Sequence, residues 1–106
     1  GKTYNFDVEV RWTGEVLKWW RREGHFVYPE DIKRAIEQNP EVIVIGTGES
    51  GVMEVGEEAK KEIESRGIKL IIDITEEAIK TFNVICKESI KEGKSKKVIG
   101  LFHLTC

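Results

Sequence analysis

The stretch Val42–Gly51, VIVIGTGESG, joins four β-branched apolar residues to three glycines spaced GxGxxG. The apolar residues predict a buried strand, because they lack the polar alternation of a strand with one face in water. Gly46, Gly48 and Gly51 leave backbone amides uncovered and allow positive φ, as in loops that approach an anion. The stretch therefore predicts a central strand that ends in a glycine loop, and this loop is the best candidate for a site.

A dinucleotide-binding βαβ unit is one interpretation of the glycine spacing. A second apolar run, Ile68–Ile72, ends in Asp73, about where a ribose-binding acid would be expected. A dinucleotide site also needs a helix directly after the last glycine, whereas Val52–Gly56 has the pattern of extended chain. We therefore expect no dinucleotide to bind. A tight turn that needs small residues for packing is the simpler explanation of the glycines.

Composition limits the classes of function. The 106 residues are enough for a single domain, residues 1–106, but too few for separate cofactor and substrate domains. A net charge of −2 and a pI near 5.8 give no electrostatic reason to bind nucleic acid or an acidic membrane. No membrane-spanning apolar run or signal sequence is visible, so we expect a cytoplasmic protein. Charged residues make up 34% while amide side chains are scarce, a balance typical of thermophile proteins.

Hydrophobic periodicity predicts an α/β fold that follows a β-ribbon. Alternation from Tyr4 to Val10 and a turn at Thr13-Gly14 predict an antiparallel ribbon with Glu15–Trp20 as its second strand. From residue 29 onward, predicted strands and helices alternate. The elements expected there are a helix from Pro29 to Asn39, the strand Val42–Ile45, a surface helix Glu57–Arg66, a strand Ile68–Ile74, a helix from an N-cap at Thr75 to Gly93, and a strand Val98–Cys106.

Five motifs, in this order along the chain, resemble the Mth938-domain family of small archaeal, bacterial and eukaryotic proteins. They are WWRREGH at Trp19–His25, Pro29-Glu30-Asp31, VIVIGTGESGVMEV at Val42–Val55, TEEA at Thr75–Ala78 and HLTC at His103–Cys106. The resemblance implies a three-layer α/β domain with a central mixed sheet, helices on both sides and an added N-terminal antiparallel β-ribbon. Relatives include an adipogenesis-associated protein and a mitochondrial complex I assembly factor, and the family implies no established catalytic activity.

The predicted site is a cleft where the glycine loop meets the tryptophan and arginine segment. Arg21 or Arg22 could supply a counter-charge, and His25 beside them could recognise an anion or an aromatic ligand. His103 could act as an acid or base, although a buried histidine hydrogen-bonded within the fold is the simpler interpretation. No catalytic residue set, metal site or cofactor emerges from the spacing. The predicted cleft residues are Gly46, Thr47, Gly48, Ser50, Gly51, Trp20, Arg21, Arg22, His25, His103 and Thr105.

Neither cysteine indicates chemistry. Cys86 falls on the apolar face of its predicted helix and belongs to the core, and the spacing of Cys86 and Cys106 matches neither a metal site nor a redox motif. We expect both thiols to be reduced.

Two classes of function remain. The first is a non-enzymatic binding or assembly domain with a cleft at the GTGESG loop, and with a protein or a small anion as its partner. The alternative is a small-molecule or anion-binding enzyme that uses the loop amides, Arg21 or Arg22, and His103. We also expect a homodimer, because Trp12, Trp19 and Trp20 are many for a ribbon that a small core covers on one face. The simpler alternative is that one or two of these tryptophans fold over the sheet.

Overall fold

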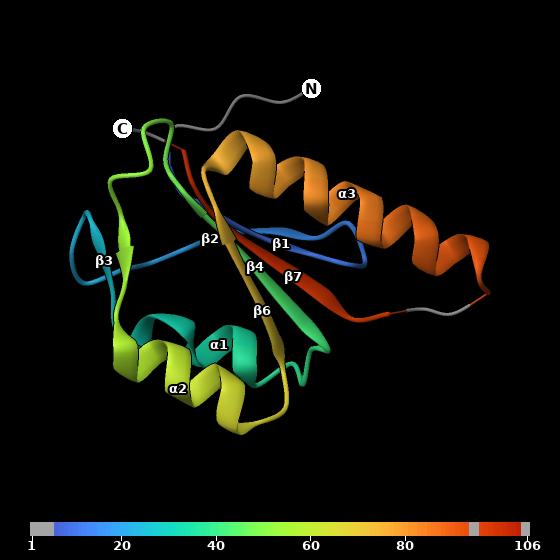
Figure 1. The fold of residues 1–106 in the computed structure, drawn as a ribbon, viewed down its shortest axis with the longest axis horizontal. Helices are drawn as coiled ribbons and strands as arrows, with labels where there is room; N and C mark the ends of the chain where they lie inside the picture. The colour runs from blue at the N-terminus through green and yellow to red at the C-terminus, as the bar shows by residue number, and fades with distance from the viewer. Residues whose placement is uncertain (1–5, 94–95, 105–106) are drawn as a thin grey trace.

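A five-stranded mixed sheet forms the middle layer of the molecule (Figure 1). The computed structural model describes residues 6–93 and 96–104. The strands lie in the order β2-β1-β7-β4-β6, where β1 is antiparallel to β2 and β7, and β4 is parallel to β7 and β6. Their bounds are Val8–Arg11 for β1, Val16–Lys18 for β2, Val42–Thr47 for β4, Lys69–Asp73 for β6 and Val98–His103 for β7.

Helices cover both faces of this sheet. The long helix α3, Thr75–Lys91, lies on one face, while α1, Lys33–Ile36, and α2, Glu57–Ser65, lie on the other (Figure 1). A 3-10 turn, Pro29–Ile32, leads into α1, and the short strands β3, Phe26–Val27, and β5, Glu54–Val55, pair in parallel as a separate two-stranded sheet. The predicted three-layer α/β fold with an N-terminal antiparallel ribbon is therefore confirmed.

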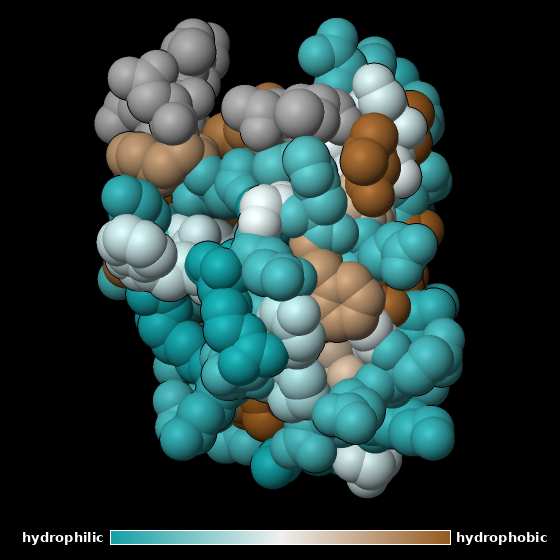
Figure 2. Space-filling view, turned by 90° about the vertical axis from the view of Figure 1, so that its left-hand side faces the viewer, coloured by the Kyte–Doolittle hydropathy of each residue, from teal (hydrophilic) through white to brown (hydrophobic). Residues whose placement is uncertain are grey.

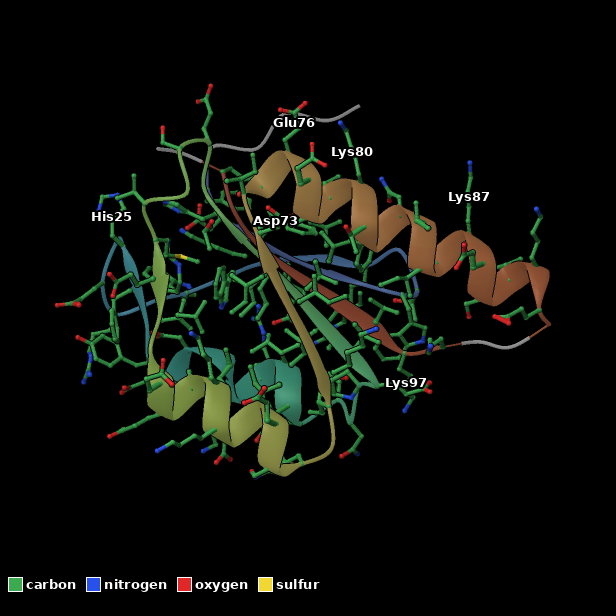
Figure 3. The ribbon with its side chains drawn as sticks, in the orientation of Figure 1. His25, Asp73, Glu76, Lys80, Lys87 and Lys97 are labelled. Carbon is green, nitrogen blue, oxygen red and sulfur yellow. The ribbon has the colours of Figure 1, made fainter. Side chains whose placement is uncertain are left out.

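The outer surface is mostly polar. Figure 2 shows one face that is largely hydrophilic, with separate hydrophobic areas. On α3, the charged residues Glu76, Lys80 and Lys87 point away from the sheet (Figure 3), and Glu76 pairs with Lys80 one helical turn later. Within residues 6–93 and 96–104, no helix is long and apolar enough to cross a membrane.

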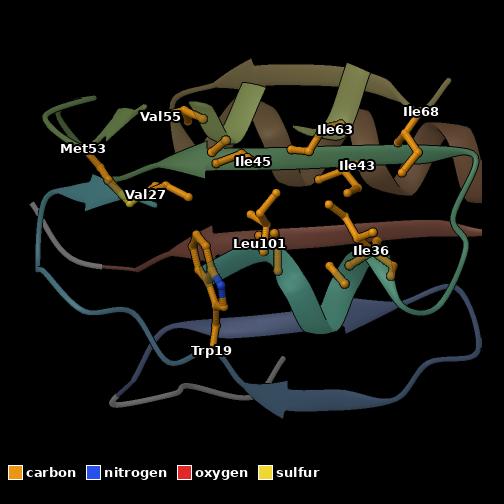
Figure 4. Close-up of a cluster of buried hydrophobic side chains, with 14 residues drawn as sticks. Trp19, Val27, Ile36, Ile43, Ile45, Met53, Val55, Ile63, Ile68 and Leu101 are labelled. Atoms are coloured by element: carbon orange, nitrogen blue, oxygen red, sulfur yellow. The ribbon is translucent and has the colours of Figure 1, made fainter. Parts of the chain in front are cut away.

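Two hydrophobic clusters lie on opposite faces of the sheet. Ile43 and Ile45 point from β4 into the cluster shared with α1 and α2, which Figure 4 shows with Trp19 at its margin. Val42 and Val44 point the other way, into the cluster beneath α3. Successive side chains of a strand alternate between faces, so the four apolar residues at positions 42–45 supply both clusters. The predicted central strand is confirmed, and it is buried along its whole length.

Some predicted boundaries are wrong. The helix expected from Pro29 to Asn39 is a 3-10 turn followed by a single turn of α-helix, and the second ribbon strand contains only Val16–Lys18. The first strand, expected from Tyr4, begins at Val8, and Tyr4 lies outside the described residues. The last strand, expected to reach Cys106, ends at His103, and Thr105 and Cys106 also lie outside them.

Thr75 does not cap its helix, which is a further correction. Ile74 occupies the N-cap position, and Thr75 is the first residue of α3. The Thr75 hydroxyl is buried and donates to the carbonyl oxygen of His103 at 2.5 Å, so it bonds to the sheet rather than to its own helix. The stop at the other end is as predicted, because Gly93 follows α3 with a φ of 70°.

The three tryptophans do not form the exposed aromatic cluster that the sequence suggested for the ribbon, so they give no reason to expect self-association there. Trp19 is only 4% exposed, belongs to the cluster beneath α1 and α2, and donates its indole N–H to the carbonyl oxygen of Asp31 at 2.8 Å. Trp12 is partly buried against the same cluster. Trp20, at 72% exposed, is the one tryptophan of the three that remains at the surface.

This difference in burial predicts that two adjacent substitutions have very different effects on the free energy of unfolding. Trp19→Ala should lower the free energy of unfolding by about 3–5 kcal/mol, because it empties a filled core position. Trp20→Ala should change it by less than about 0.5 kcal/mol, because the ring is exposed. Urea unfolding followed by circular dichroism measures both values. Equal losses in the two variants would contradict the placement of Trp19.

Candidate functional site

One end of the sheet brings the glycine loop beside His103. Thr47, the last residue of β4, is the register partner of His103, the last residue of β7. Because β1 runs antiparallel to β7, Asp7 just before β1 lies at this same end. Arg21 arrives there too, since it follows β2, which runs antiparallel to β1. The topology therefore gathers residues that are far apart in the sequence.

Asp7, Arg21 and His103 form a mostly buried charge network. Arg21 donates through Nη2 to Oδ2 of Asp7, and Nδ1 of His103 lies 2.8 Å from the same oxygen. The other carboxylate oxygen, Oδ1, accepts the backbone N–H of Leu104 at 2.9 Å. The side chains of Arg21 and Asp7 are 6% and 13% exposed. Buried charges of this kind are stable only when they are paired, and this network pairs both.

The protonation of the network follows from its contacts. Burial by itself raises the pKa of Asp7, but the hydrogen bonds from Arg21, His103 and the Leu104 amide outweigh it, so the pKa is lowered overall. Asp7 is therefore a carboxylate at neutral pH. Nδ1 of His103 also lies 2.9 Å from Nη2 of Arg21. A proton on Nδ1 would be donated to Asp7, whereas an unprotonated Nδ1 accepts from Arg21.

Arg21 is fixed on its other sides as well. Its Nη1 donates to the carbonyl oxygens of Glu23 and Gly24, both at 2.7 Å, and its guanidinium carbon lies 5.0 Å from the centre of the Trp19 ring. Its buried Nε has no hydrogen-bond partner among the described residues. Through its bonds to the carbonyl oxygens of Glu23 and Gly24, the guanidinium holds the chain between β2 and β3 in place.

The glycine loop is tied to α3 through Thr75. The amide of Gly48 donates to Oγ1 of Thr75 at 2.8 Å, and the amide of Thr75 donates to the carbonyl oxygen of Gly48 at 3.1 Å. Thr47 donates its hydroxyl to the carbonyl oxygen of Asp73 at 3.1 Å. Gly48 and Gly51 have φ values of 102° and 70°, which favour glycine. The loop is thus a tight connection with internal bonds.

Residues 1–103 match the model of a protein family of unknown function, DUF498/DUF598. The chain belongs to this family.

Solved structures share the fold of this DUF498/DUF598 protein. A conserved hypothetical protein from Pyrococcus horikoshii OT3, PH1505, matches with a TM-score of 0.77 and 22% identity, over 100% of this chain and 88% of that one. XCC1710 from Xanthomonas campestris matches with a TM-score of 0.75 and 19% identity, over 95% and 71% of the two chains. An outer membrane protein from Bartonella henselae matches with a TM-score of 0.70 and 22% identity, over 97% and 81%. At these identities, the matches show the fold alone.

The structure brings several predicted cleft residues of this DUF498/DUF598 protein together. Gly46, Thr47 and Gly48 lie at the end of β4, beside His103 and close to Arg21 through the charge network. Gly51 lies in the same loop, with the side chain of Ile74 against it. His25 meets His103 edge to face, with ring centres 5.7 Å apart.

The remaining predicted cleft residues make their contacts elsewhere. The Lys18 ammonium lies 4.5 Å from the Trp20 ring, and the Arg22 guanidinium lies 3.9 Å from the ring of Tyr28. Arg22 also pairs with Glu30 at 3.4 Å. Ser50 is exposed at the tip of the loop, and Thr105 lies outside the described residues.

Sequence reasoning missed Asp7 and the tertiary role of Thr75. Asp7 occupies a polar position in an alternating strand pattern, and its partners Arg21 and His103 are 14 and 96 residues away. No local signal identifies such a partner. Among the described residues, no group of histidine, cysteine, aspartate or glutamate side chains is arranged to hold a metal ion. Cys86 is half-buried, and burial raises the pKa of its thiol.

A methyl group added at Gly46 should test the tight junction of loop, β4 and α3. A Cβ atom there would lie 2.8 Å from Oγ1 and 2.9 Å from Cα of Thr75, so Gly46→Ala should lower the free energy of unfolding by about 1–3 kcal/mol. Gly24→Ala is the matched control, because a Cβ at Gly24 would meet no atom within 4 Å. Thermal unfolding of both variants makes the comparison, and an unchanged melting temperature for Gly46→Ala would refute the close approach.

Acid should weaken the fold through Asp7. Its folded pKa lies below the unfolded value of 3.8, so the unfolded chain binds more protons and stability is lost as pH falls through 3.8 toward the folded pKa. Asp7→Asn should remove this part of the pH dependence. It should also cost about 3–5 kcal/mol at pH 7, because Arg21 then stays buried without its counter-charge.

Urea unfolding between pH 2.5 and 7 measures both effects of Asp7→Asn. The control is Glu15→Gln, which neutralises an exposed carboxylate with an ion pair to Arg11. A pH dependence that is the same in Asp7→Asn as in the unmodified protein would contradict the role of Asp7.

Proposed function

We propose that this protein is a non-enzymatic binding domain of the Mth938 type that acts in assembly by docking another polypeptide. The docking surface is the outer edge of β6 together with the adjoining side of the glycine loop. The sequence resemblance to a family that includes a complex I assembly factor supports the class of function.

The observation that carries the proposal is an open strand edge with exposed apolar side chains. Among the described residues, β6 pairs only with β4, so its other edge lacks a neighbour. Ile72 is 39% exposed. Ile74, two residues later, is also exposed, and the glycine loop comes against it at Gly51, which the exposed Val52 follows in the chain. An edge of this kind is a template for another strand, and apolar side chains on it favour a polypeptide partner.

The alternative, an enzyme for small molecules or anions, needs its polar groups to be available to a ligand. Arg21 and His103 are instead bonded to each other and to Asp7, and the Gly48 amide is bonded to Thr75. An anion in the predicted cleft would have to replace these internal bonds, and the second arginine, Arg22, makes its contacts elsewhere. The assembly function therefore has the stronger support.

Photo-cross-linking in cells of the source organism tests the docking surface. A benzophenone amino acid at Ile72 should give cross-links to a polypeptide, because this side chain lies on the proposed edge. The same amino acid at Val16 is the matched control, since Val16 is 36% exposed on β2 at the opposite edge of the sheet. Cross-linking that is absent at position 72, or equal at both positions, would reject the docking surface.

A further inference from the structure

We propose that the partner at this edge is a second copy of the chain, paired antiparallel through β6 around a twofold axis at Ile71. The inference rests on the proposed function, because it names the partner of the same surface. It replaces the tryptophan surface expected from the sequence with a different one. The two five-stranded sheets would then join into one continuous ten-stranded sheet.

The backbone of β6 directs hydrogen-bonding groups away from β4, toward the open edge of the sheet. The amide of Lys69 donates to the carbonyl oxygen of Glu41 at the start of the β4 pairing, so Lys69 directs its hydrogen-bonding groups toward β4. Backbone groups alternate along a strand, which turns those of Leu70 and Ile72 toward the open edge. In an antiparallel pair centred on Ile71, Leu70 of each copy faces Ile72 of the other. The outward groups of the two copies therefore meet.

The side chains of β6 are complementary to a second copy in this same register. The strand reads Lys69-Leu70-Ile71-Ile72-Asp73, with a cation at one end, an anion at the other and three apolar residues between. Antiparallel pairing about Ile71 places Lys69 of each copy opposite Asp73 of the other. Lys69 and Asp73 are exposed, and neither has a salt bridge within the described part of the chain. Two oppositely charged cross-strand pairs then flank an apolar centre.

Other registers lose this match. A shift by one residue places outward backbone groups opposite inward ones, so the ladder cannot form. Shifts that keep the backbone match move each charge: centred on Leu70, Lys69 faces Ile71, and centred on Ile72, Asp73 faces Ile71. A closed dimer also requires a twofold axis. When this axis is perpendicular to the sheet, the two copies of β6 that it relates are antiparallel.

The opposite edge of the sheet is less suited to pairing. There, β2 has only three residues, Val16–Lys18, and ends in an exposed lysine. Short edge strands with lysine are a common protection against pairing. By contrast, β6 has five residues, and Figure 3 shows Asp73 at its end beside the start of α3.

Charge reversal at the two ends of β6 tests the register. At about 100 μM, sedimentation equilibrium should give the unmodified protein a mass twice the 12.2 kDa of one chain. Lys69→Glu and Asp73→Lys each put like charges opposite each other twice, and each should raise the dissociation constant at least about tenfold. The double variant with both substitutions should restore the dimer. The control Lys18→Glu, a charge reversal on β2, should leave it unchanged.

A monomeric unmodified protein would overturn the inference. So would a dimer that is unaffected by the single variants, or a double variant that is not rescued. Both substituted residues are exposed, and circular dichroism confirms that each variant is folded. The cross-link from position 72 separates this inference from the proposed function. A product with the mass of two chains supports both, whereas a monomer that cross-links to a polypeptide of another mass rejects only the second copy as the partner.

Discussion

The double-sided burial of β4 is the constraint on which the rest of the structure depends. Every residue of Val42–Thr47 is buried, with β7 and β6 on its two sides and a hydrophobic cluster on each face. A strand in this position needs helices above and below it, and parallel neighbours need crossover connections that supply such helices. The three layers follow from this requirement, and so does the site, because a buried parallel strand places its following loop at the sheet end where β7 also stops.

The charge network at that sheet end connects three segments of the chain. Within the described residues, the N-terminal ribbon joins the rest of the sheet through the pairing of β1 with β7, and the chain then leaves β2 toward β3. Arg21, Asp7 and His103 hold these three segments together by hydrogen bonds between side chains that are mostly buried. Desolvation makes such a network costly unless every charge has a partner. Residues with the chemistry of an active site therefore have a structural function here.

The two edges of the sheet differ in a way that bears on assembly. The β2 edge is short and ends in a lysine, whereas the β6 edge is longer, carries exposed isoleucines and has opposite charges at its two ends. The glycine loop lies against Ile74 at one end of β6. The glycine loop thus adjoins the surface proposed to bind a partner. Its tight turn is explained by packing and hydrogen bonding against Thr75.

The sequence by itself determined the central strand, the ribbon and the alternation of the longer strands and helices from β4 onward, but not the short strands β3 and β5. It also suggested positive φ for the three loop glycines, which holds at Gly48 and Gly51 but not at Gly46, a residue of β4. These features depend on local periodicity and on residues a few positions apart, and a single chain displays them directly. Only the tertiary structure decided that Trp19 is core, that Thr75 bonds to β7 rather than capping α3, and that Asp7 pairs with Arg21 and His103. Each of these outcomes depends on which distant strands become neighbours. A polar residue with partners 14 or 96 positions away has no local pattern by which it could be recognised.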